Sequence, residues 1–443
     1  MIVPQWNLVC GDDYLVELSS TMYMVGTTCG TIFLTPLSDR WGRKTVLLAC
    51  LWVQAVVGIC LAWMPSIIPF VVLQFFIGIT NMTIALCAYV LIVETFAMDT
   101  RELPALSLQF FWAGGIMVLS LFAYLVREWR YLQLLVSLPQ VLTIAYFWLL
   151  PESLTWLLVT GKVSRAKELI VRVLRVNLLP PIDDLDQTLA AFKDSAARQM
   201  SFEVVADKET HSTDDLVKPA AVDTLVNSLA YFGISFGMPS LNGDRFLNFF
   251  ISGAVEVPAY IICIICNRRV GRRLPICVFL IVCAVANIAF IFTPQQTDDG
   301  RDLSALKTTL VMIGKFGITG SYSALYLYGS EIFPTSIRNH AVGLCSFFEN
   351  IGSIAAPQIV YASKSLSNLP MTLFAVMTLV GAVDVLFLPE THKMALPTTI
   401  QDVENWAQRR RGARSGGDSK TAVSTGTDRI NSSFNPDGIA NDQ

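Results

Sequence analysis

The chain has 443 residues, of which 53% are hydrophobic and 15% charged, with a net charge of −3. Soluble proteins carry about 25% charged residues, so this composition excludes an ordinary cytosolic enzyme and a disordered chain. The near balance of 32 basic and 35 acidic residues also argues against a nucleic-acid-binding protein, which needs a basic surface. We expect the lipid bilayer, and no nucleic acid, as a partner.

Apolar runs long enough to span a bilayer, roughly 17–25 residues, recur along the chain. Five of them precede a long polar stretch and six follow it. In chain order they are 14–37, 46–64, 69–96, 105–126, 131–150, 224–239, 246–266, 274–293, 307–330, 341–362 and 369–388. Such runs are typical of transmembrane helices, so we predict an all-α polytopic membrane protein.

The polar segments divide the chain into parts. Residues 1–13 precede the first run, and residues 151–223 separate the fifth run from the sixth. We predict an N-terminal helix bundle over 14–150 and a C-terminal helix bundle over 224–388. The Ser, Gly and Asn content of 389–443 predicts a largely disordered tail.

Basic residues are distributed unevenly across the predicted membrane. The loops on one side, together with the long loop and the tail, hold 25 Lys and Arg, whereas the loops on the other side hold five. Loops rich in Lys and Arg remain in the cytoplasm. The long loop and the tail are therefore predicted to be cytoplasmic, and residues 1–13 extracellular.

Cysteine and histidine offer little for chemistry. Nine of the ten cysteines lie within or at the ends of apolar runs, where they behave as small hydrophobic residues. Cys263 and Cys266 have the spacing of a redox or zinc pair, but no second pair follows them. We expect no metal site and no cofactor. We also expect no enzymatic activity, because no Ser, His or paired-acid constellation converges in the apolar runs.

Two loops are similar to each other. Asp39-Arg40-Trp41-Gly42-Arg43-Lys44 follows the first run, and Arg269-Val270-Gly271-Arg272-Arg273 follows the second run of the second half. If the halves are repeats, the first half is one helix short, with about eleven of twelve helices present. One interpretation is an incomplete sequence. The other is a chain that begins at Met1 without that helix.

Five segments together resemble the organic ion transporter family of the major facilitator superfamily, which includes organic cation, carnitine and organic anion transporters. They are Trp6-Asn7-Leu8-Val9-Cys10, residues 37–44, Pro151-Glu152-Ser153 with Trp156-Leu157-Leu158, residues 331–339, and Leu388-Pro389-Glu390-Thr391 with Leu396-Pro397. The resemblance implies a major facilitator fold with two pseudo-repeated helix bundles. It also implies transport of small organic ions across the plasma membrane by alternating access.

The resemblance further implies a cytoplasmic gate in the charged segments that follow the runs. There an acid such as Asp39 accepts hydrogen bonds from a helix terminus or an Arg while the cytoplasmic side is closed. The alternative is that these charges only anchor helix ends at the membrane surface. The candidate gate residues are Asp39, Arg40, Gly42, Arg43, Lys44, Glu152, Glu331, Arg338 and Glu390.

Ionisable residues at membrane depth mark candidate cavity positions, because each costs roughly 2.5–3.5 kcal/mol to insert. Glu256 and Lys315 match charged positions of cation-transporting family members, or else form a buried pair that holds the second half together. Asn350 stands where the family has an acid in cation transporters and an Arg in anion or carnitine transporters. The candidate cavity residues are Glu256, Lys315, Glu349, Asn350, Tyr231, Phe232 and Tyr322.

Two mid-run acids against one Lys favour cations. We therefore predict facilitative, potential-driven transport of small organic cations. The alternatives are organic anion exchange, Na⁺-coupled uptake of carnitine or another zwitterion, and, if the first helix is truly absent, a non-transporting membrane regulator. A Glu256→Gln substitution that abolishes uptake would separate a transporter from a regulator.

Overall fold

The computed structural model describes residues 12–96, 102–178, 214–238, 243–296, 302–333, 338–363 and 368–391, with Trp6, Pro180, Leu185, Leu189, Leu241 and Leu366. The side chains of 102–106, 214–217, 330 and 338–340 lie outside this description. The chain divides into two units, 1–400 and 401–443, and every described residue belongs to the first.

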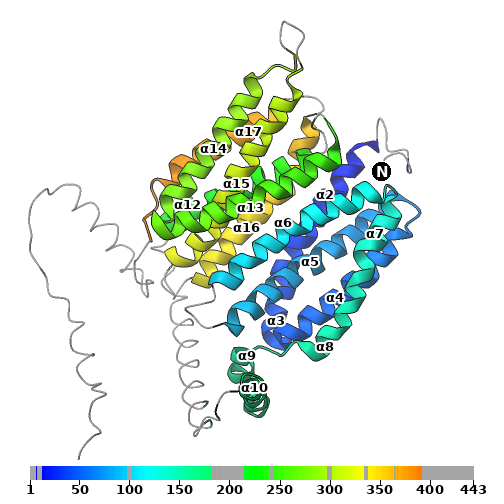
Figure 1. Ribbon diagram of the computed structural model, residues 1–443, viewed down its shortest axis with the longest axis vertical. Coiled ribbons are helices and arrows are strands. Elements are labelled where there is room, and N and C mark those ends of the chain that lie inside the picture. Colours follow the sequence, from blue (N-terminus) through cyan, green and yellow to red (C-terminus); the bar gives the residue numbers. More distant parts are fainter. Residues whose placement is uncertain are drawn as a thin grey trace, which may run out of the picture. The chain divides into compact units, whose positions relative to one another are not determined.

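The N-terminal half consists of long helical segments, followed by two short helices in the connecting loop (Figure 1). The long segments are α2 (Tyr14–Cys29) continued by η2 (Gly30–Leu34) and α3 (Thr35–Trp41), α4 (Arg43–Ala62), α5 (Ile67–Thr95), α6 (Glu102–Leu125), and α7 (Trp129–Ser137) continued by η3 (Leu138–Ala145) and α8 (Tyr146–Leu149). The short helices are α9 (Leu154–Val159) and α10 (Val163–Val176).

The described residues of the C-terminal half form six helices. They are α12 (Asp214–Gly237), α13 (Arg245–Arg269), α14 (Arg273–Phe292), α15 (Ser304–Ile332), α16 (Arg338–Ala362) and α17 (Leu369–Val385). Helix α12 begins at Asp214, before the expected bundle boundary at 224. The apolar run underestimates the length of this helix, because the first turns of the helix are polar and contain Pro219.

Within the described residues, six helical segments are long and apolar enough to cross a membrane. These are Arg43–Ala62, Ile67–Thr95, Ser107–Leu125, Trp129–Leu149, Arg245–Arg269 and Arg273–Phe292, and Leu369–Val385 is a shorter apolar helix. Helices α12, α15 and α16 are less apolar because they bury polar side chains, among them Asn227, Lys315 and Asn350. Polar groups at membrane depth normally face a bundle interior or a cavity.

The surfaces of these helices are apolar where lipid would contact them. Large hydrophobic side chains such as Ile68, Phe111 and Phe292 are at least 72% exposed. A soluble protein rarely exposes so many of them. The interior of the C-terminal half is instead a continuous hydrophobic cluster that includes Ile234 and Phe374. This pattern fits a protein embedded in a bilayer.

In the N-terminal half, small residues bring α2 and α5 into close contact. A Cβ atom on Gly26 would collide with the carbonyl oxygen of Phe75, and one on Gly30 with that of Ile79. Gly26 and Gly30 form a small-xxx-small pattern, which lets transmembrane helices approach each other closely. A π-helical turn over Gly30–Leu34 follows directly.

The two halves contact each other through α6 with α13 and through α2 with α16. Figure 1 shows α6 and α13 side by side. The Ser120 hydroxyl donates to the Phe246 carbonyl at 2.5 Å, and Gln358 Nε2 donates to Thr21 Oγ1 at 2.8 Å. Tyr361 OH donates to Asp13 Oδ1 at 2.9 Å. These three bonds lie toward the helix ends opposite the α3–α4 loop. Deeper in the bundle, Ser323 Oγ of α15 donates to Gln109 Oε1 of α6 at 2.6 Å, so the halves are also joined there.

Candidate substrate cavity and gate

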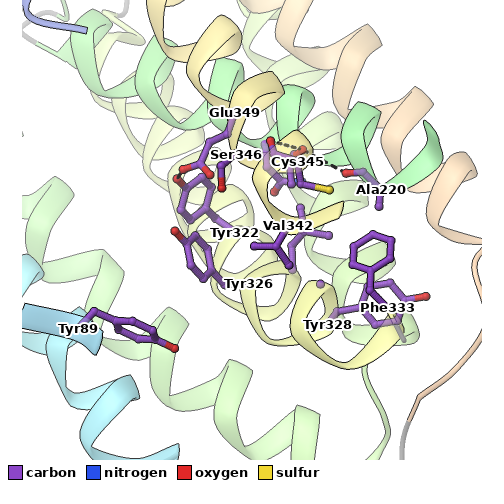
Figure 2. Close-up of a pocket in the computed structure, with 14 residues that line it drawn as sticks. Tyr89, Ala220, Tyr322, Tyr326, Tyr328, Phe333, Val342, Cys345, Ser346 and Glu349 are labelled. Atoms are coloured by element: carbon purple, nitrogen blue, oxygen red, sulfur yellow. Dashed lines mark hydrogen bonds between the residues drawn. The ribbon is translucent and has the colours of Figure 1, made fainter. Parts of the chain in front are cut away.

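A cavity of about 200 Å³ opens in the C-terminal half (Figure 2). It is lined by residues from α12, α15 and α16, and by Tyr89 of α5 in the N-terminal half. Glu349 is the single acid in its lining, and no Lys or Arg of the described residues lines it. The cavity therefore offers one negative group in a largely apolar and aromatic setting.

Glu349 is held in place by its neighbours. The hydroxyl of Tyr322 donates a hydrogen bond to Glu349 Oε1, and Figure 2 shows the two groups pointing at each other. The ring of Tyr326 follows one turn along α15, with its centroid 6.1 Å from that of Tyr322. Ser228 Oγ of α12 donates to the backbone carbonyl of Glu349 at 2.5 Å. The carboxylate thus lies beside two aromatic rings that also line the cavity.

Glu256 and Lys315 form a closed buried pair behind this cavity. Lys315 Nζ lies 3.0 Å from Glu256 Oε1, with the two side chains 1% and 0% exposed. The hydroxyls of Tyr231 and Tyr260 donate to the two Glu256 oxygens at 2.8 and 3.0 Å. Lys315 also donates to Ser235 Oγ at 2.6 Å. Neither charged side chain lines the cavity.

Tyr231 connects the buried pair to the cavity wall and to the other half. Its ring stacks on Tyr322 with centroids 5.3 Å apart, and Lys315 Nζ lies 3.4 Å from its centroid. Trp112 Nε1 of α6 donates to the Tyr231 hydroxyl at 2.9 Å. Phe232 packs edge-on against Tyr231, with centroids 5.3 Å apart.

Asn350 does not reach the cavity. Its Nδ2 donates to the Ser346 carbonyl one turn back at 2.8 Å, and the residue is 8% exposed. Of the seven predicted cavity residues, only Glu349 and Tyr322 line the cavity. Tyr231 stacks on Tyr322 without lining the cavity, and Glu256, Lys315 and Phe232 contact Tyr231.

The sequence interpretation missed several lining residues. Asn227 lines the cavity, is fully buried, and has an Oδ1 atom without a hydrogen-bond partner. Its position in a polar helix was the available signal. Tyr89 could not be found from its run, because it reaches the cavity only through the packing of the two halves.

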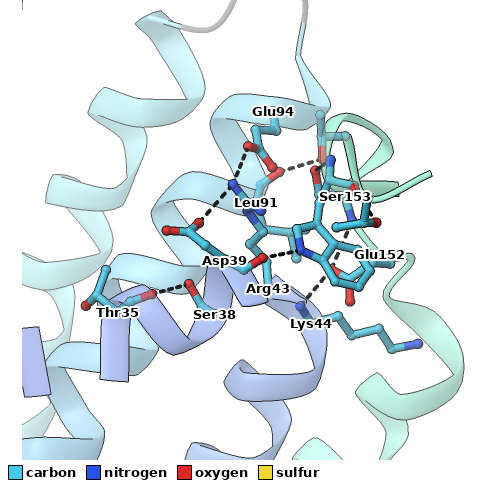
Figure 3. Close-up of polar contacts among 12 residues, drawn as sticks. Thr35, Ser38, Asp39, Arg43, Lys44, Leu91, Glu94, Glu152 and Ser153 are labelled. Atoms are coloured by element: carbon cyan, nitrogen blue, oxygen red, sulfur yellow. Dashed lines mark hydrogen bonds and ion pairs between the residues drawn. The ribbon is translucent and has the colours of Figure 1, made fainter. Parts of the chain in front are cut away.

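A polar cluster joins α3, α4, α5 and the start of α9 (Figure 3). Glu152 Oε1 accepts the backbone N–H of Lys44 at 2.9 Å, at the N-terminus of α4. Arg43 lies 3.2 Å from both Asp39 Oδ1 and Glu94 Oε1. Trp156 Nε1 donates to the Asp39 carbonyl at 2.6 Å. This N-terminal gate cluster fixes four helix ends against one another.

A second cluster repeats this arrangement at α14. Glu390 accepts the backbone N–H groups of Arg272 and Arg273 at 2.7 and 3.2 Å. Arg272 Nη2 lies 2.9 Å from Glu331 Oε1, and Thr391 Oγ1 donates to Glu331 Oε2 at 2.7 Å. This C-terminal gate cluster links the ends of α14, α15 and α17.

The predicted gate set divides between these clusters. Lys44 also donates from Nζ to the Phe147 carbonyl at 2.8 Å. Arg40 is exposed and makes no hydrogen bond or ion pair with the described residues, and the Arg338 side chain lies outside the described residues. Glu94 and Arg272 were not in the predicted set. Arg272 could have been found, because it follows the second-loop glycine as Arg43 follows Gly42.

No group of three His, Cys, Asp or Glu residues suited to a metal ion occurs in the described part of the chain. Nine cysteines there are free thiols, including Cys263 and Cys266. The chemistry of the described site is therefore that of hydrogen bonds, one carboxylate and aromatic faces.

Comparison with known proteins agrees with this architecture. The family described as "Sugar (and other) transporter" matches residues 10–399. The "Organic cation transporter protein" of Drosophila melanogaster is 31% identical over 416 residues, covering 92% of this chain and 74% of the relative. The human "Organic cation/carnitine transporter 2" is 33% identical over 405 residues, covering 91% and 71%. The rabbit (Oryctolagus cuniculus) "Organic anion transporter 3" is 32% identical over 414 residues, covering 91% and 74%.

Solved structures identify the fold. The proton:xylose symporter XylE, bound to a bromodeoxyglucose, has a TM-score of 0.65 at 16% identity, covering 87% of this chain and 88% of the symporter. XylE in its inward-open conformation also has a TM-score of 0.65, at 16% identity, covering 88% of each chain. The predicted all-α major facilitator fold is confirmed, and the protein is a multi-pass membrane transporter rather than an enzyme. The chain belongs to the organic ion transporter family of the major facilitator superfamily.

Proposed function

We propose that this transporter carries small organic cations and binds them in the cavity beside Glu349. The observation that carries the proposal is the charge of the lining, which contains one carboxylate and no Lys or Arg among the described residues. The relatives are named for cations, carnitine and anions alike, so their names do not decide the sign of the substrate.

The cavity has the chemistry that a desolvated cation needs. Glu349 supplies the counter-charge, and the faces of Tyr322, Tyr326 and Tyr89 supply aromatic contacts. A cation over an aromatic ring gains about 2 kcal/mol when it is desolvated. A volume of about 200 Å³ is smaller than the ~300–1,000 Å³ of sites for drug-sized ligands. We therefore infer a compact ammonium ion.

The Glu256–Lys315 pair favours neither sign. Each charge neutralises the other at 3.0 Å, and Tyr231, Tyr260 and Ser235 satisfy the remaining polar atoms. An anion could use Lys315 only by displacing Glu256. We therefore propose a structural role for the pair, one layer behind the bound substrate, in place of the direct contact that the sequence favoured.

Transport is proposed to occur by alternating access between the two halves. Three hydrogen bonds between the halves lie toward the helix ends opposite the α3–α4 loop, and two others, Trp112–Tyr231 and Ser323–Gln109, join α6 to α12 and α15 deeper in the bundle. The cavity is lined by the parts of α12, α15 and α16 nearer to that loop side. The position of the cavity supports a state open toward the loop side, in which the bound ion would exchange with that compartment.

The loop side is proposed to be the cytoplasm, and the membrane the plasma membrane. The distribution of Lys and Arg supports this orientation, with 151–223 and 389–443 inside and 1–13 outside. For a monovalent cation, a potential of about 100 mV supplies ~2.3 kcal/mol, which corresponds to roughly fiftyfold accumulation. The membrane potential alone would therefore be sufficient to drive facilitative accumulation of the cation.

The gate is proposed to consist of the two polar clusters. Asp39, Arg43, Lys44 and Glu152 would hold the cytoplasmic ends of the N-terminal half, and Glu331 and Glu390 those of the C-terminal half. Arg40, Gly42 and Arg338 complete the proposed set. The described contacts of each cluster lie within one half, so each half would move as a unit when the transporter changes state.

Uptake of tetraethylammonium by cells expressing the chain tests the substrate proposal. We expect uptake that rises with membrane potential, and a KM at least about 30-fold higher for Glu349→Gln, because a buried charge that loses its partner costs roughly 2–5 kcal/mol. Asp384→Asn is the control, since this acid lies on α17 and does not line the cavity. Both variants are compared at equal surface abundance.

Three outcomes contradict the proposal. Uptake of the anion p-aminohippurate in place of tetraethylammonium would favour the anion alternative. Unchanged tetraethylammonium uptake by Glu349→Gln would remove this residue from the site. No uptake of either probe by protein at the cell surface would favour the non-transporting regulator.

A further inference from the structure

A second and larger cavity, of about 740 Å³, lies on the loop side of the N-terminal half. It is bounded by α3, α4, α8, α9 and α10, and shares no lining residue with the cavity beside Glu349. We propose that it binds the headgroup of an anionic phospholipid from the adjacent membrane leaflet. The proposal rests on the orientation proposed above, and does not depend on the transported substrate.

Charge is the first argument. Lys44, Lys162, Arg165 and Arg172 line the cavity, against the two acids Glu152 and Glu168. Glu152 already accepts the backbone N–H of Lys44 at 2.9 Å, which occupies one of its oxygens at the start of α4. The side chains that line the cavity therefore carry a net positive charge. Basic pockets on the cytoplasmic side of membrane proteins bind phosphate-bearing lipid headgroups.

Arg165 and Arg172 are the groups most available to a ligand. They are seven residues apart on α10, so two turns of helix place them on the same face. Both are exposed, and neither forms an ion pair with a described residue. The guanidinium group binds phosphate through two parallel hydrogen bonds. Lys162 is partly engaged, since its Nζ lies 4.0 Å from the ring centroid of Trp156.

The mouth of the cavity is aromatic. Trp41, Trp52 and Trp148 line it and are 60%, 37% and 66% exposed, and Phe147 is 61% exposed. Exposed Trp side chains gather at the level of lipid headgroups. This ring provides an apolar contact for the glycerol and upper acyl chain of a lipid, which a soluble phosphate would not use. The combination of basic wall and aromatic rim therefore favours a lipid.

A lipid in this cavity would contact the N-terminal gate cluster. Lys44, Glu152 and Trp156 belong both to that cluster and to the cavity lining. A bound phosphate would therefore link the exposed helix α10 to the start of α4. The composition of the leaflet would be coupled to the gate through this contact.

Native mass spectrometry of the full chain in neutral detergent, titrated with phosphatidylserine, tests the site. We expect one bound lipid, with an affinity about 30-fold lower for R165Q/R172Q, or about 2 kcal/mol at ~1 kcal/mol for each basic residue. K167Q/R175Q is the matched control, because it removes the same charge from α10 at positions that do not line the cavity. R165K/R172K should retain most of the binding.

Four results would overturn the proposal. Equal weakening in both neutralised double variants would indicate diffuse charge attraction, and unchanged affinity in R165Q/R172Q would exclude the cavity. Equal binding of phosphatidylcholine would show that the negative headgroup is not recognised. Competition by O-phosphoserine or inorganic phosphate at the affinity of the lipid would assign the site to a soluble anion. Matched unfolding temperatures of the variants establish that folding is unchanged.

Discussion

Glu390 holds the start of α14 in the same way that Glu152 holds the start of α4. Glu152 accepts the backbone N–H of Lys44 at 2.9 Å, and Glu390 accepts that of Arg272 at 2.7 Å. Both acids follow a proline after a half-bundle and return to a distant helix N-terminus, where the helix dipole favours a negative charge. The gate is thus built twice, once in each half.

This symmetry predicts similar effects for Glu152→Gln and Glu390→Gln. Each substitution keeps a hydrogen-bond acceptor but removes the charge at the helix N-terminus, so we expect a destabilisation of about 1 kcal/mol. The maximal rate of uptake should fall in both variants with little change in KM, because neither acid lines the cavity beside Glu349. Initial uptake rates over a range of substrate concentrations provide the measurement. A selective change in KM would contradict a gate role.

A second prediction concerns Gly42 and Gly271, which lie against the carboxylates of Glu152 and Glu390. Gly42 and Gly271 have φ angles of 108° and 122°, and a Cβ on either would meet the carboxylate of Glu152 or Glu390. Backbone conformations of this kind cost about 1–3 kcal/mol for other residues. Gly42→Ala and Gly271→Ala should therefore lower the unfolding temperature and the uptake rate.

Gly114→Ala is the control for these two substitutions. Gly114 lies within α6, and a Cβ there would meet nothing within 4 Å. Alanine in a helix is favoured over glycine by roughly 0.5–1 kcal/mol. An unfolding temperature that falls equally in all three variants would show that the loop geometry has no special role.

A third prediction tests whether the aromatic ring of Tyr326 or its hydroxyl contributes to substrate binding. Its ring lines the cavity beside Glu349, and the proposed cation would contact the face of this ring. Tyr326→Phe should leave the KM for tetraethylammonium nearly unchanged. Tyr326→Ala should raise it by up to about 30-fold, which corresponds to ~2 kcal/mol. An equal increase in both variants, measured by uptake at matched surface abundance, would favour a hydrogen bond over a cation–π contact.

The fold was predictable because bilayer-spanning helices leave long apolar runs. The start of α12 was not, because Asp214, Asp215, Lys218 and Asp223 interrupt its apolar pattern while Ala220 and Ala221 are buried. Helix α12 packs closely against α16, where a Cβ on Gly352 would collide with the Leu225 carbonyl oxygen. Hydropathy therefore underestimates the length of a membrane helix that packs against its neighbour through small residues.

The cavity was predictable only in part. Glu349 and Tyr322 were found because ionisable and aromatic residues in an apolar run are informative, and the structure brings them to the cavity. The Glu256 side chain could point into the cavity or toward Lys315. Which of the two it does depends on how α13 and α15 are rotated about their axes. A run of apolar residues does not define that rotation, since every face of such a helix is apolar.

The buried pair provides the last prediction. Breaking a buried ion pair by removing one partner costs about 3–5 kcal/mol, whereas replacing both with uncharged residues is often nearly neutral. Glu256→Gln and Lys315→Met should therefore each reduce the amount of folded protein. The double variant E256Q/K315M should recover folded protein and, because neither residue lines the cavity, also tetraethylammonium uptake. Recovery of folding without recovery of uptake, measured by surface labelling beside flux, would instead assign Glu256 to the substrate, as the sequence had favoured.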